Sequence, residues 1–345
     1  MRQAIFHGPG RPITIEPAEV TPPGPDDVLI KVARCGICGS DVSMTGNTVF
    51  TFLPGPIGHE YAGEIVEVGA NVTGLKPGQR VACLPSSPCG ACTGCRTGNV
   101  VLCTARRQAA GGSSGFGGFG DYVTVPAIAA RPLPASLSFA DGALVEPMAC
   151  GLHALRLAAM EPGARVLVLG AGTMALSVTY WARRLGAGRI VVASRSAHRR
   201  EIAGRFGADA FHSFAEDDPA GLDDALGGPP DLVAECVGKE GMLGQAAGYV
   251  RPQGTVLSMG MCQCAEPVAP AAFNFRETKL VFPIAYTIDE FVETARAFDA
   301  DDMPPEAMVS DVIALEALPG MIEQMRAGAW RGLKVQVDPT RGATE

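Results

Sequence analysis

Residues 166–175 read VLVLGAGTMA, in which four apolar residues run directly into a glycine-rich turn. A continuous apolar run is typical of a strand buried on both faces of a parallel sheet. Gly170 permits a tight turn, Gly172 lets the start of a helix approach a pyrophosphate, and Ala175 allows close packing between helix and strand. Strand, turn and helix together predict a dinucleotide-binding unit. The residues expected to bind the cofactor are Gly170, Gly172, Thr173 and Met174.

Strands alternate with helices around this turn, from about residue 155 to residue 285. Further apolar strand candidates lie at 190–193, 231–234, 255–259 and 279–282. A helix over 174–185 is ended by Gly186, since glycine readily adopts the backbone conformation that ends a helix. This alternation implies an α/β unit with a doubly wound parallel sheet.

The residues after the strand at 190–193 distinguish NAD from NADP. An NAD site normally carries an acidic residue there, which binds the ribose 2′-hydroxyl group. This chain has no carboxylate at that point and continues with Ser194, Arg195 and, four residues later, Arg199. A serine hydroxyl can donate to a phosphate, and a guanidinium binds phosphate as a planar fork. We therefore expect NADP(H) to be preferred; the alternative is that the arginines form a solvated helix face.

Residues 1 to about 135 show a different pattern, with short strands separated by dense turn signals. Strand candidates lie at 28–32, 64–68 and 78–82. The pattern predicts an antiparallel barrel or sandwich with long inserted loops. The glycine-rich run at 111–120 contains two phenylalanines, which favour an ordered loop over a linker. From about residue 286, two helical segments and a strand at 333–337 complete the chain.

One inserted loop carries four closely spaced cysteines: Cys89, Cys92, Cys95 and Cys103. Three cysteines with two residues between each neighbouring pair can surround one ion. The fourth can complete the tetrahedron that Zn²⁺ forms with thiolates. The alternative is an iron–sulfur cluster, but the bacterial cluster motif ends Cys-x₃-Cys-Pro, whereas this loop ends Cys-x₇-Cys-Thr. We expect a structural zinc site, because four thiolates leave no open coordination position.

A second group of metal-binding residue types is spread over three segments of the first half of the chain. Its members are Cys38, His59, Glu60 and Glu146. A thiolate, an imidazole and a carboxylate together predict a mixed zinc site. Such sites usually keep one coordination position open for water or substrate.

The chain resembles the zinc-dependent medium-chain dehydrogenases/reductases, nearest the sorbitol-type polyol and secondary-alcohol branch. The resemblance covers almost the whole chain and is carried by GICGSD at 36–41, GHE at 58–60, LVEP at 144–147, the four-cysteine loop and the glycine motif. It implies a GroES-like β-barrel catalytic domain formed by residues 1–153 and 286–345. A Rossmann domain at 154–285 would lie between these segments in the sequence. The resemblance also implies a homodimer or homotetramer.

The resemblance implies a role for each residue of the mixed site. Cys38 and His59 would ligate a catalytic zinc ion. Glu60 and Glu146 would supply carboxylates that ligate the ion or hold its bound water, and which of them ligates stays open. Ser40 would carry the first proton between the substrate oxygen and solvent; the alternative for Ser40 is a turn hydroxyl without a catalytic role.

Two neighbours of this motif have different expected roles. Asp41 matches a position from which a carboxylate orients a metal ligand. Cys35 is expected to pack as a buried strand residue, because free cysteine behaves as a small hydrophobe. Many relatives carry a histidine that completes a proton relay where this chain has Ser43. A serine cannot act as a base at neutral pH, so we expect protonation to depend little on a group titrating at about pH 6–7.

Lys334 matches a basic family position that reaches the cofactor pyrophosphate; the alternative is a solvated strand lysine. Four phenylalanines match loops that line the substrate cleft in relatives: Phe50, Phe52, Phe116 and Phe119. Aromatic side chains there would favour an apolar ketone or secondary alcohol over a naked polyol.

The composition limits the partners. A formal net charge of −8 argues against binding to nucleic acid or anionic membranes, which requires clustered lysine and arginine. The sequence contains no apolar stretch of membrane-spanning length. Its 11 cysteines, odd in number and partly in metal-like spacing, fit reduced thiols in the cytoplasm.

The implied function is reversible, zinc-assisted hydride transfer between NADP(H) and a secondary alcohol or ketone. A zinc ion would polarise the carbonyl or lower the pKa of the bound alcohol. The chain would hold two zinc ions, one catalytic and one structural. The alternatives are an NADPH-dependent reductase of an activated C=C bond and a non-catalytic binding protein on the same scaffold.

Overall fold

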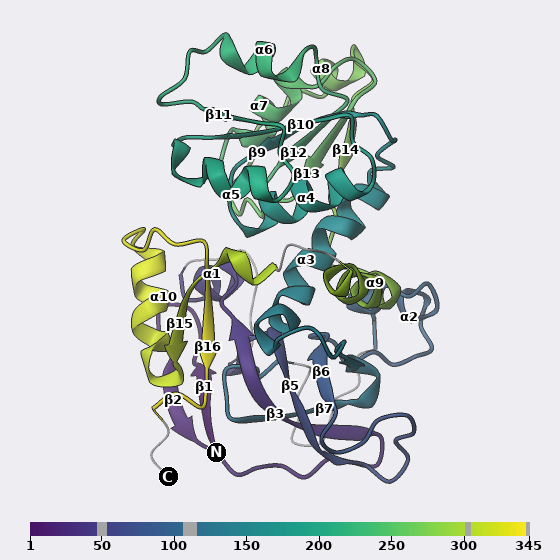
Figure 1. Cartoon of the computed structure of the whole chain (residues 1–345), viewed down its shortest axis with the longest axis vertical. Coiled ribbons are helices and arrows are strands. Elements are labelled where there is room, and N and C mark those ends of the chain that lie inside the picture. Colours follow the sequence, from purple (N-terminus) through teal and green to yellow (C-terminus); the bar gives the residue numbers. More distant parts are fainter. Residues whose placement is uncertain (47–53, 106–115, 301–304, 343–345) are drawn as a thin grey trace. The chain divides into compact units, whose positions relative to one another are not determined.

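The structure, a computed structural model, describes the chain except for residues 47–53, 106–115, 301–304 and 343–345 (Figure 1). The chain forms two compact units, one from residues 1–146 and 287–345 and the other from residues 147–286. Along the sequence, the second unit begins at Pro147, which lies inside the continuous helix α3 (Phe139–Leu157). The boundary predicted from the sequence, after residue 153, lies later in the same helix.

The first unit is built on a sheet whose described strands follow the order β15-β16-β3-β5-β6-β8, with β7 paired to β3. The strands are β3 (Asp27–Gly36), β5 (Glu60–Val68), β6 (Arg80–Cys83), β7 (Tyr122–Pro126), β8 (Ala130–Pro132), β15 (Val309–Ala314) and β16 (Lys334–Asp338). β3 pairs antiparallel with β5, β7 and β16, and its pairing with β5 shifts register twice. Such bulges bend a sheet, as a barrel requires.

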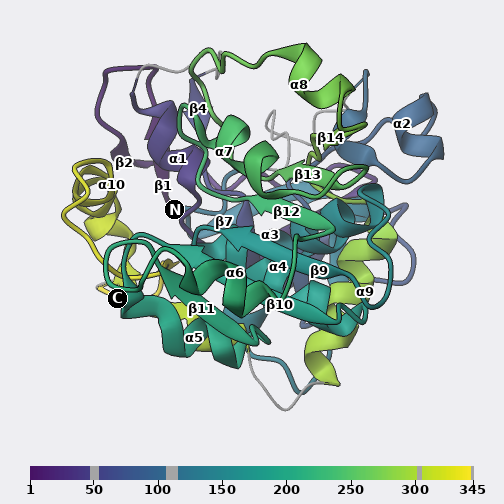
Figure 2. The same cartoon turned by 90° about the horizontal axis from the view of Figure 1, so that it is seen from above.

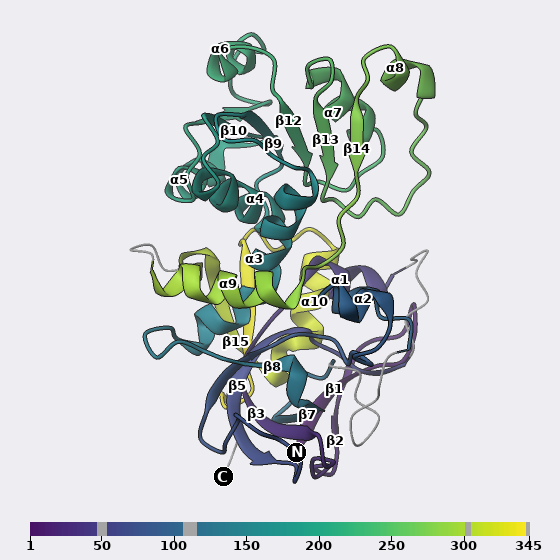
Figure 3. The same ribbon diagram turned by 90° about the vertical axis from the view of Figure 1, so that its right-hand side faces the viewer.

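Smaller elements complete this unit (Figure 3). β1 (Arg2–Phe6), β2 (Thr14–Pro17) and β4 (Gly55–Pro56) form a separate short sheet. The helices are α1 (Gly39–Met44), α2 (Thr93–Arg96), α9 (Ile288–Asp299) and α10 (Leu318–Arg326). Tyr61, Phe119, Ile30 and Val337 are among the buried residues of the barrel core. The strands predicted at 28–32, 64–68, 78–82 and 333–337 and the two late helices are confirmed, whereas β1, β2, β4, β7, β8 and β15 were not predicted.

The second unit is a parallel sheet whose described strands follow the order β11-β10-β9-β12-β13-β14 (Figure 2). The strands are β9 (Arg165–Leu169), β10 (Arg189–Ser194), β11 (Ala210–Ser213), β12 (Leu232–Glu235), β13 (Thr255–Ser258) and β14 (Lys279–Val281). Numbered along this unit, the order is 3-2-1-4-5-6, that of the Rossmann fold. The doubly wound sheet is therefore confirmed; β11 was not predicted.

Helices cover both faces of this parallel sheet. They are α4 (Thr173–Arg184), α5 (Arg200–Arg205), α6 (Gly221–Leu226), α7 (Met242–Tyr249) and α8 (Pro270–Asn274). In Figure 1, α4 and α5 lie on one face and α6 and α7 on the other. α4 ends before Gly186, whose φ of +85° favours glycine. Among the helices that the structure describes, none has both the length and the apolar character needed to cross a bilayer.

Candidate metal and cofactor sites

The four predicted cysteines of the inserted loop converge. The sulfur atoms of Cys89, Cys92, Cys95 and Cys103 all lie within 4.8 Å of one another. Cys92 precedes α2 and Cys95 lies within it, so one helical turn brings two thiols to one side. The Sγ–Sγ distances are 3.6 Å for Cys92–Cys95 and 3.9 Å for Cys89–Cys95. Four sulfurs at this spacing fit a tetrahedral zinc ion.

Backbone amides favour the thiolate form at Cys89 and Cys92, whereas burial raises the pKa of Cys95 to about 12. The N–H groups of Ala91 and Cys92 donate to Cys89 Sγ at 3.5 and 3.4 Å. Donation from the backbone of Cys95 and Thr104 lowers the pKa of Cys92 to about 6. Because a thiolate is the species that binds a metal, this electrostatic environment suits a cation.

The second predicted cluster lies where the end of β3 pairs with the start of β5. Ligand atoms of Cys38, His59 and Glu60 lie within 4.8 Å of one another. Cys38 directly precedes α1, and Glu60 opens β5 opposite Gly36, the last residue of β3. Gly58, with φ of +97°, lets the chain turn before His59, and a Cβ there would clash with Phe119 at 2.5 Å.

Asp41 lies behind two of these ligands. Its Oδ2 accepts a hydrogen bond from the backbone N–H of Cys38 at 2.9 Å, and its Oδ1 is 3.4 Å from His59 Nδ1. In the described part of the chain, both Oδ1 and Nδ1 are buried without a well-formed hydrogen bond. Facing Nδ1 toward a carboxylate leaves Nε2 of the imidazole for a metal ion, the usual arrangement around a metal-binding histidine.

The electrostatics of His59 also suit a cation. Burial lowers the pKa of the imidazole, but the negative charge and hydrogen bonding of Asp41 and Cys38 outweigh burial and raise the pKa well above its ordinary value. The cluster therefore stabilises positive charge at this point. A metal ion would have to displace a proton to bind there.

A buried ion pair, which the sequence did not predict, lies beside the cluster. Lys334 Nζ is 2.7 and 2.9 Å from the two carboxylate oxygens of Glu60 and 3.0 Å from the carbonyl of Ile37. The Lys334 and Glu60 side chains are 3% and 1% exposed. Burial lowers the pKa of Lys334, but Glu60 and Cys38 more than offset this and raise the pKa. The alternative of a solvated strand lysine is wrong.

Gly36 makes room for the Glu60 carboxylate. A Cβ at Gly36 would lie 2.1 Å from Glu60 Oε2. Glu146 is also buried, and its charge contributes to the raised pKa of Lys334. Among the described residues, however, the carboxylate in the three-residue metal cluster is that of Glu60, and Glu146 is not a member.

The remaining residues around the motif have distinct positions. Ser40 lies in the first turn of α1, two residues after Cys38, with a half-buried side chain. Ser43 is exposed, and its hydroxyl donates to the carbonyl of Gly39 at 2.9 Å, within its own helix. Cys35 is fully buried in the barrel core, as predicted.

The predicted aromatic lining divides into two cases. The ring of Phe116 lies 5.8 Å from that of His59, so Phe116 borders the metal cluster. Phe119 is fully buried in the barrel core instead, and its expected place in a substrate-lining loop is wrong. Phe50 and Phe52 lie outside the described residues, as does the 111–115 part of the glycine-rich run.

In the second unit, the glycine motif joins β9 to α4. Gly170 has φ of +107°, and its N–H donates to the carbonyl of Ala193 on β10 at 2.7 Å. A Cβ at Gly172 would meet, of the described atoms, only Arg199 Nη1 at 4.0 Å. Gly172 precedes the first turn of α4, in which Thr173 and Met174 are half-buried. This open helix N-terminus is suited to binding a phosphate group.

The residues predicted to select the cofactor lie next to this turn. Ser194 ends β10, and Arg195 is exposed just beyond it. Arg199 Nη1 donates to the carbonyl of Ala171 within the glycine turn at 2.9 Å. Burial lowers the pKa of this guanidinium. A cation therefore lies against the loop where a phosphate would bind.

Glu235 lies beside the glycine motif of the predicted cofactor site and was not predicted from the sequence. It ends β12, is buried, and accepts hydrogen bonds from the N–H groups of Val237 and Gly238 at 2.5 and 2.9 Å. A Cβ at Gly170 would approach Val237 to 3.3 Å, so Glu235 fixes a turn against the glycine motif. The available signal was an acidic residue at the end of an otherwise apolar strand.

Comparison with known proteins agrees with this geometry. Residues 24–135 match the family model described as alcohol dehydrogenase GroES-like domain, and residues 170–300 match the model described as zinc-binding dehydrogenase. The GroES-like domain and the Rossmann-type sheet expected from the sequence are thus confirmed.

Individual relatives cover most of the chain. L-galactonate-5-dehydrogenase of Escherichia coli is 33% identical over 85% of this chain and 86% of its own length, and sorbitol dehydrogenase of Ovis aries is 30% identical over 97% and 96%. A Sinorhizobium meliloti structure, assigned as a zinc-binding dehydrogenase and bound to NADP, has a TM-score of 0.87 and 31% identity, covering 98% of this chain and 99% of that one. The chain therefore belongs to the zinc-type medium-chain dehydrogenases, within their polyol branch.

Proposed function

We propose that this chain transfers a hydride between NADP(H) and a secondary alcohol or ketone with the help of a zinc ion. The observation that carries the proposal is the buried cluster of Cys38, His59 and Glu60, supported by Asp41 and Lys334. A thiolate, an imidazole and a carboxylate are the donor types of catalytic zinc sites. When bound, the zinc ion would polarise the substrate oxygen as a Lewis acid.

The residues around the cluster would position the metal ligands and transfer the proton. The Asp41 carboxylate would orient the His59 ring from the Nδ1 side, and it accepts a hydrogen bond from the backbone N–H of Cys38. Lys334 holds the Glu60 carboxylate by two contacts, which restrains how far it can move toward a metal ion. Ser40 would pass a proton from the substrate oxygen to water. Ser43 cannot continue that relay as a base, because a serine hydroxyl is not basic at neutral pH; its proton is donated to the carbonyl of Gly39.

A second zinc ion would stabilise the four-cysteine loop and take no part in the chemistry. Replacing Cys103 with serine should remove this ion and lower the thermal unfolding midpoint, because binding energy at a structural zinc site is folding energy. Metal analysis should give one zinc ion per chain in place of two. The Cys264→Ser variant, at an exposed thiol outside both metal groups, is the control and should keep both ions. Unchanged zinc content in Cys103→Ser would contradict the assignment.

NADP(H) is the cofactor that the second unit favours. Ser194, Arg195 and Arg199 follow β10 without a carboxylate among them, and Arg199 reaches the glycine turn. The NADP bound to the Sinorhizobium meliloti relative supports the same choice. Since NADPH usually acts as the reductant in cells, we propose ketone reduction as the working direction.

The arginines give a direct test of cofactor choice. Replacing Arg195 and Arg199 together with alanine should raise KM for NADPH by about tenfold or more, because hydrogen bonds to charged groups contribute about 1.5–3 kcal/mol each. KM for NADH should change far less, since NADH lacks the 2′-phosphate. Steady-state kinetics with both cofactors provide the measurement, with Arg205→Ala as the control. Equal efficiency of NADH and NADPH in the unaltered chain would contradict the proposed preference.

The substrate class follows from the relatives and from the site. Sorbitol and L-galactonate, named for two relatives, are polyhydroxylated, whereas Phe116 beside His59 adds an apolar surface. We therefore propose a panel of polyols, simple secondary alcohols and the matching ketones, assayed with NADPH and NADH. Turnover of at least one member should disappear with a chelator. Reduction of activated C=C bonds that survives chelation would favour the alternative reductase instead.

A homodimer or homotetramer is also proposed. β14 is an edge strand of the parallel sheet, and Phe275, Phe282 and Ile284 near it are 91%, 62% and 44% exposed. Apolar side chains beside an unpaired edge support association of two copies. The odd number of cysteines and the metal-like spacing of four of them support a reducing, cytoplasmic location.

A further inference from the structure

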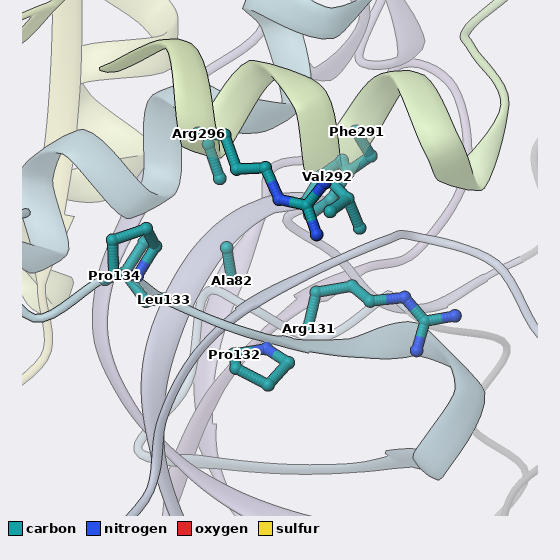
Figure 4. A pocket seen from close by; sticks show the side chains of 9 residues that line it. Ala82, Arg131, Pro132, Leu133, Pro134, Phe291, Val292 and Arg296 are labelled. Atoms are coloured by element: carbon teal, nitrogen blue, oxygen red, sulfur yellow. The ribbon is translucent and has the colours of Figure 1, made fainter. Parts of the chain in front are cut away.

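A cavity of about 300 Å³ lies within the first unit, and no residue of either metal cluster lines it (Figure 4). Helix α9 forms one wall, and β8 with the segment after it forms the other. The lining residues that matter here are Arg131, Leu133, Pro134, Phe291, Val292 and Arg296. This volume is at the lower end of the range typical of small-molecule sites.

The walls of this cavity are apolar and fixed in place. Phe291 is fully buried and Leu133 nearly so. α9 begins with a capping box, in which Thr287 Oγ1 accepts from the N–H of Glu290 at 3.2 Å and Glu290 accepts from the N–H of Thr287 at 2.8 Å. Such a cap fixes the start of the helix. The apolar surface is therefore largely formed before any ligand binds.

Two arginines line this cavity, Arg131 and Arg296. Among the described residues, neither Arg131 nor Arg296 has an ion pair within 4.0 Å, whereas Arg2, Arg34 and Arg183 each have one. Two guanidinium groups without a close carboxylate among the described residues therefore line one cavity of a chain whose net charge is −8.

Arg131 is the more deeply placed of the two. It is half-buried, and its Nη1 donates a long hydrogen bond of 3.4 Å to the carbonyl of Ala130 on its own strand. Burial lowers the pKa of Arg131, and the charge of Asp289 opposes this. A partly desolvated guanidinium is stabilised when an anion approaches it.

We propose that this cavity binds a small organic anion. Its carboxylate or phosphate group would lie at Arg131 and Arg296, and its compact apolar body would lie against Leu133, Phe291 and Val292. Guanidinium forks bind both kinds of anionic group through paired hydrogen bonds. The proposal does not depend on the hydride-transfer chemistry, because no residue of the metal clusters or of the glycine motif lines the cavity.

Isothermal titration of the zinc-loaded chain tests this proposal with four probes. Benzoate and phenyl phosphate carry both an anionic group and an apolar body, inorganic phosphate carries the anion alone, and benzamide carries the body alone. At least one of the two organic anions should bind at one saturable site per chain. Both inorganic phosphate and benzamide should bind more weakly than that ligand.

Variants locate the site. Arg131→Met and Arg296→Met should each weaken binding by about tenfold, because each removes a charge-assisted hydrogen bond. Arg296 is exposed, so its replacement leaves the fold intact, and Arg205→Met on another helix should leave the affinity unchanged. Absence of saturable binding by both organic anions would overturn the proposal. Equal binding by benzamide, or undiminished binding to the double variant Arg131→Met/Arg296→Met, would overturn it as well.

Discussion

Replacing Cys38 with alanine should lower turnover by about 10³-fold or more, because a Lewis-acidic ion contributes several kcal/mol to the transition state and each ~1.4 kcal/mol is a factor of ten. Cys38 supplies the thiolate of the cluster formed with His59 and Glu60, so its loss should also remove the metal ion of that cluster. Steady-state kinetics and metal analysis on the same sample give both values.

Cys35 provides a matched control for this variant. It is a cysteine three residues earlier on the same segment, but it is fully buried in the barrel core. Cys35→Ala should cost stability through lost packing and keep turnover per folded molecule, together with full zinc content. Equal losses of turnover in Cys35→Ala and Cys38→Ala would mean that the effect comes from the fold and not from the metal site.

Replacing Lys334 with methionine should lower the free energy of unfolding by about 3–5 kcal/mol, the usual cost of removing one partner of a buried ion pair. In the metal-free chain, the loss arises because the Glu60 carboxylate, 1% exposed, is left buried without its cationic partner. Methionine retains most of the apolar length of lysine, so packing changes little. Urea unfolding followed by fluorescence measures the shift.

A double variant separates charge from packing. Lys334→Met combined with Glu60→Gln removes both charges and should recover much of the lost stability, since no uncompensated ion remains buried. If Lys334→Met unfolds at the same urea concentration as the unaltered chain, the pair does not stabilise the fold. If the double variant is as unstable as the single one, the loss comes from packing.

The fold could be predicted because its signals are local. The apolar run at 166–169 and the glycine turn after it gave the parallel sheet, and Gly186 gave the end of α4. β11 (Ala210–Ser213) and β15 (Val309–Ala314) were missed because neither shows a distinct alternating pattern of apolar and polar residues. Their pairing depends on neighbouring strands that are distant in sequence.

The candidate metal residues could be predicted because their types and spacing are distinctive, whereas their surroundings could not. Lys334 and Glu60 are separated by 274 positions, so no local sequence pattern predicts their ion pair. Phe116 and Phe119 are three residues apart, yet one borders His59 and the other is in the core. Gly117, with φ of +125°, turns the chain between them, and the direction of such a turn cannot be predicted from the sequence.

Zinc content and turnover, measured on one preparation before and after chelation, test the central claim most directly. We expect two zinc ions per chain at first, loss of turnover when the ion of Cys38, His59 and Glu60 is removed, and recovery when zinc is restored. Full turnover in a preparation that holds zinc only in the four-cysteine loop would contradict the account.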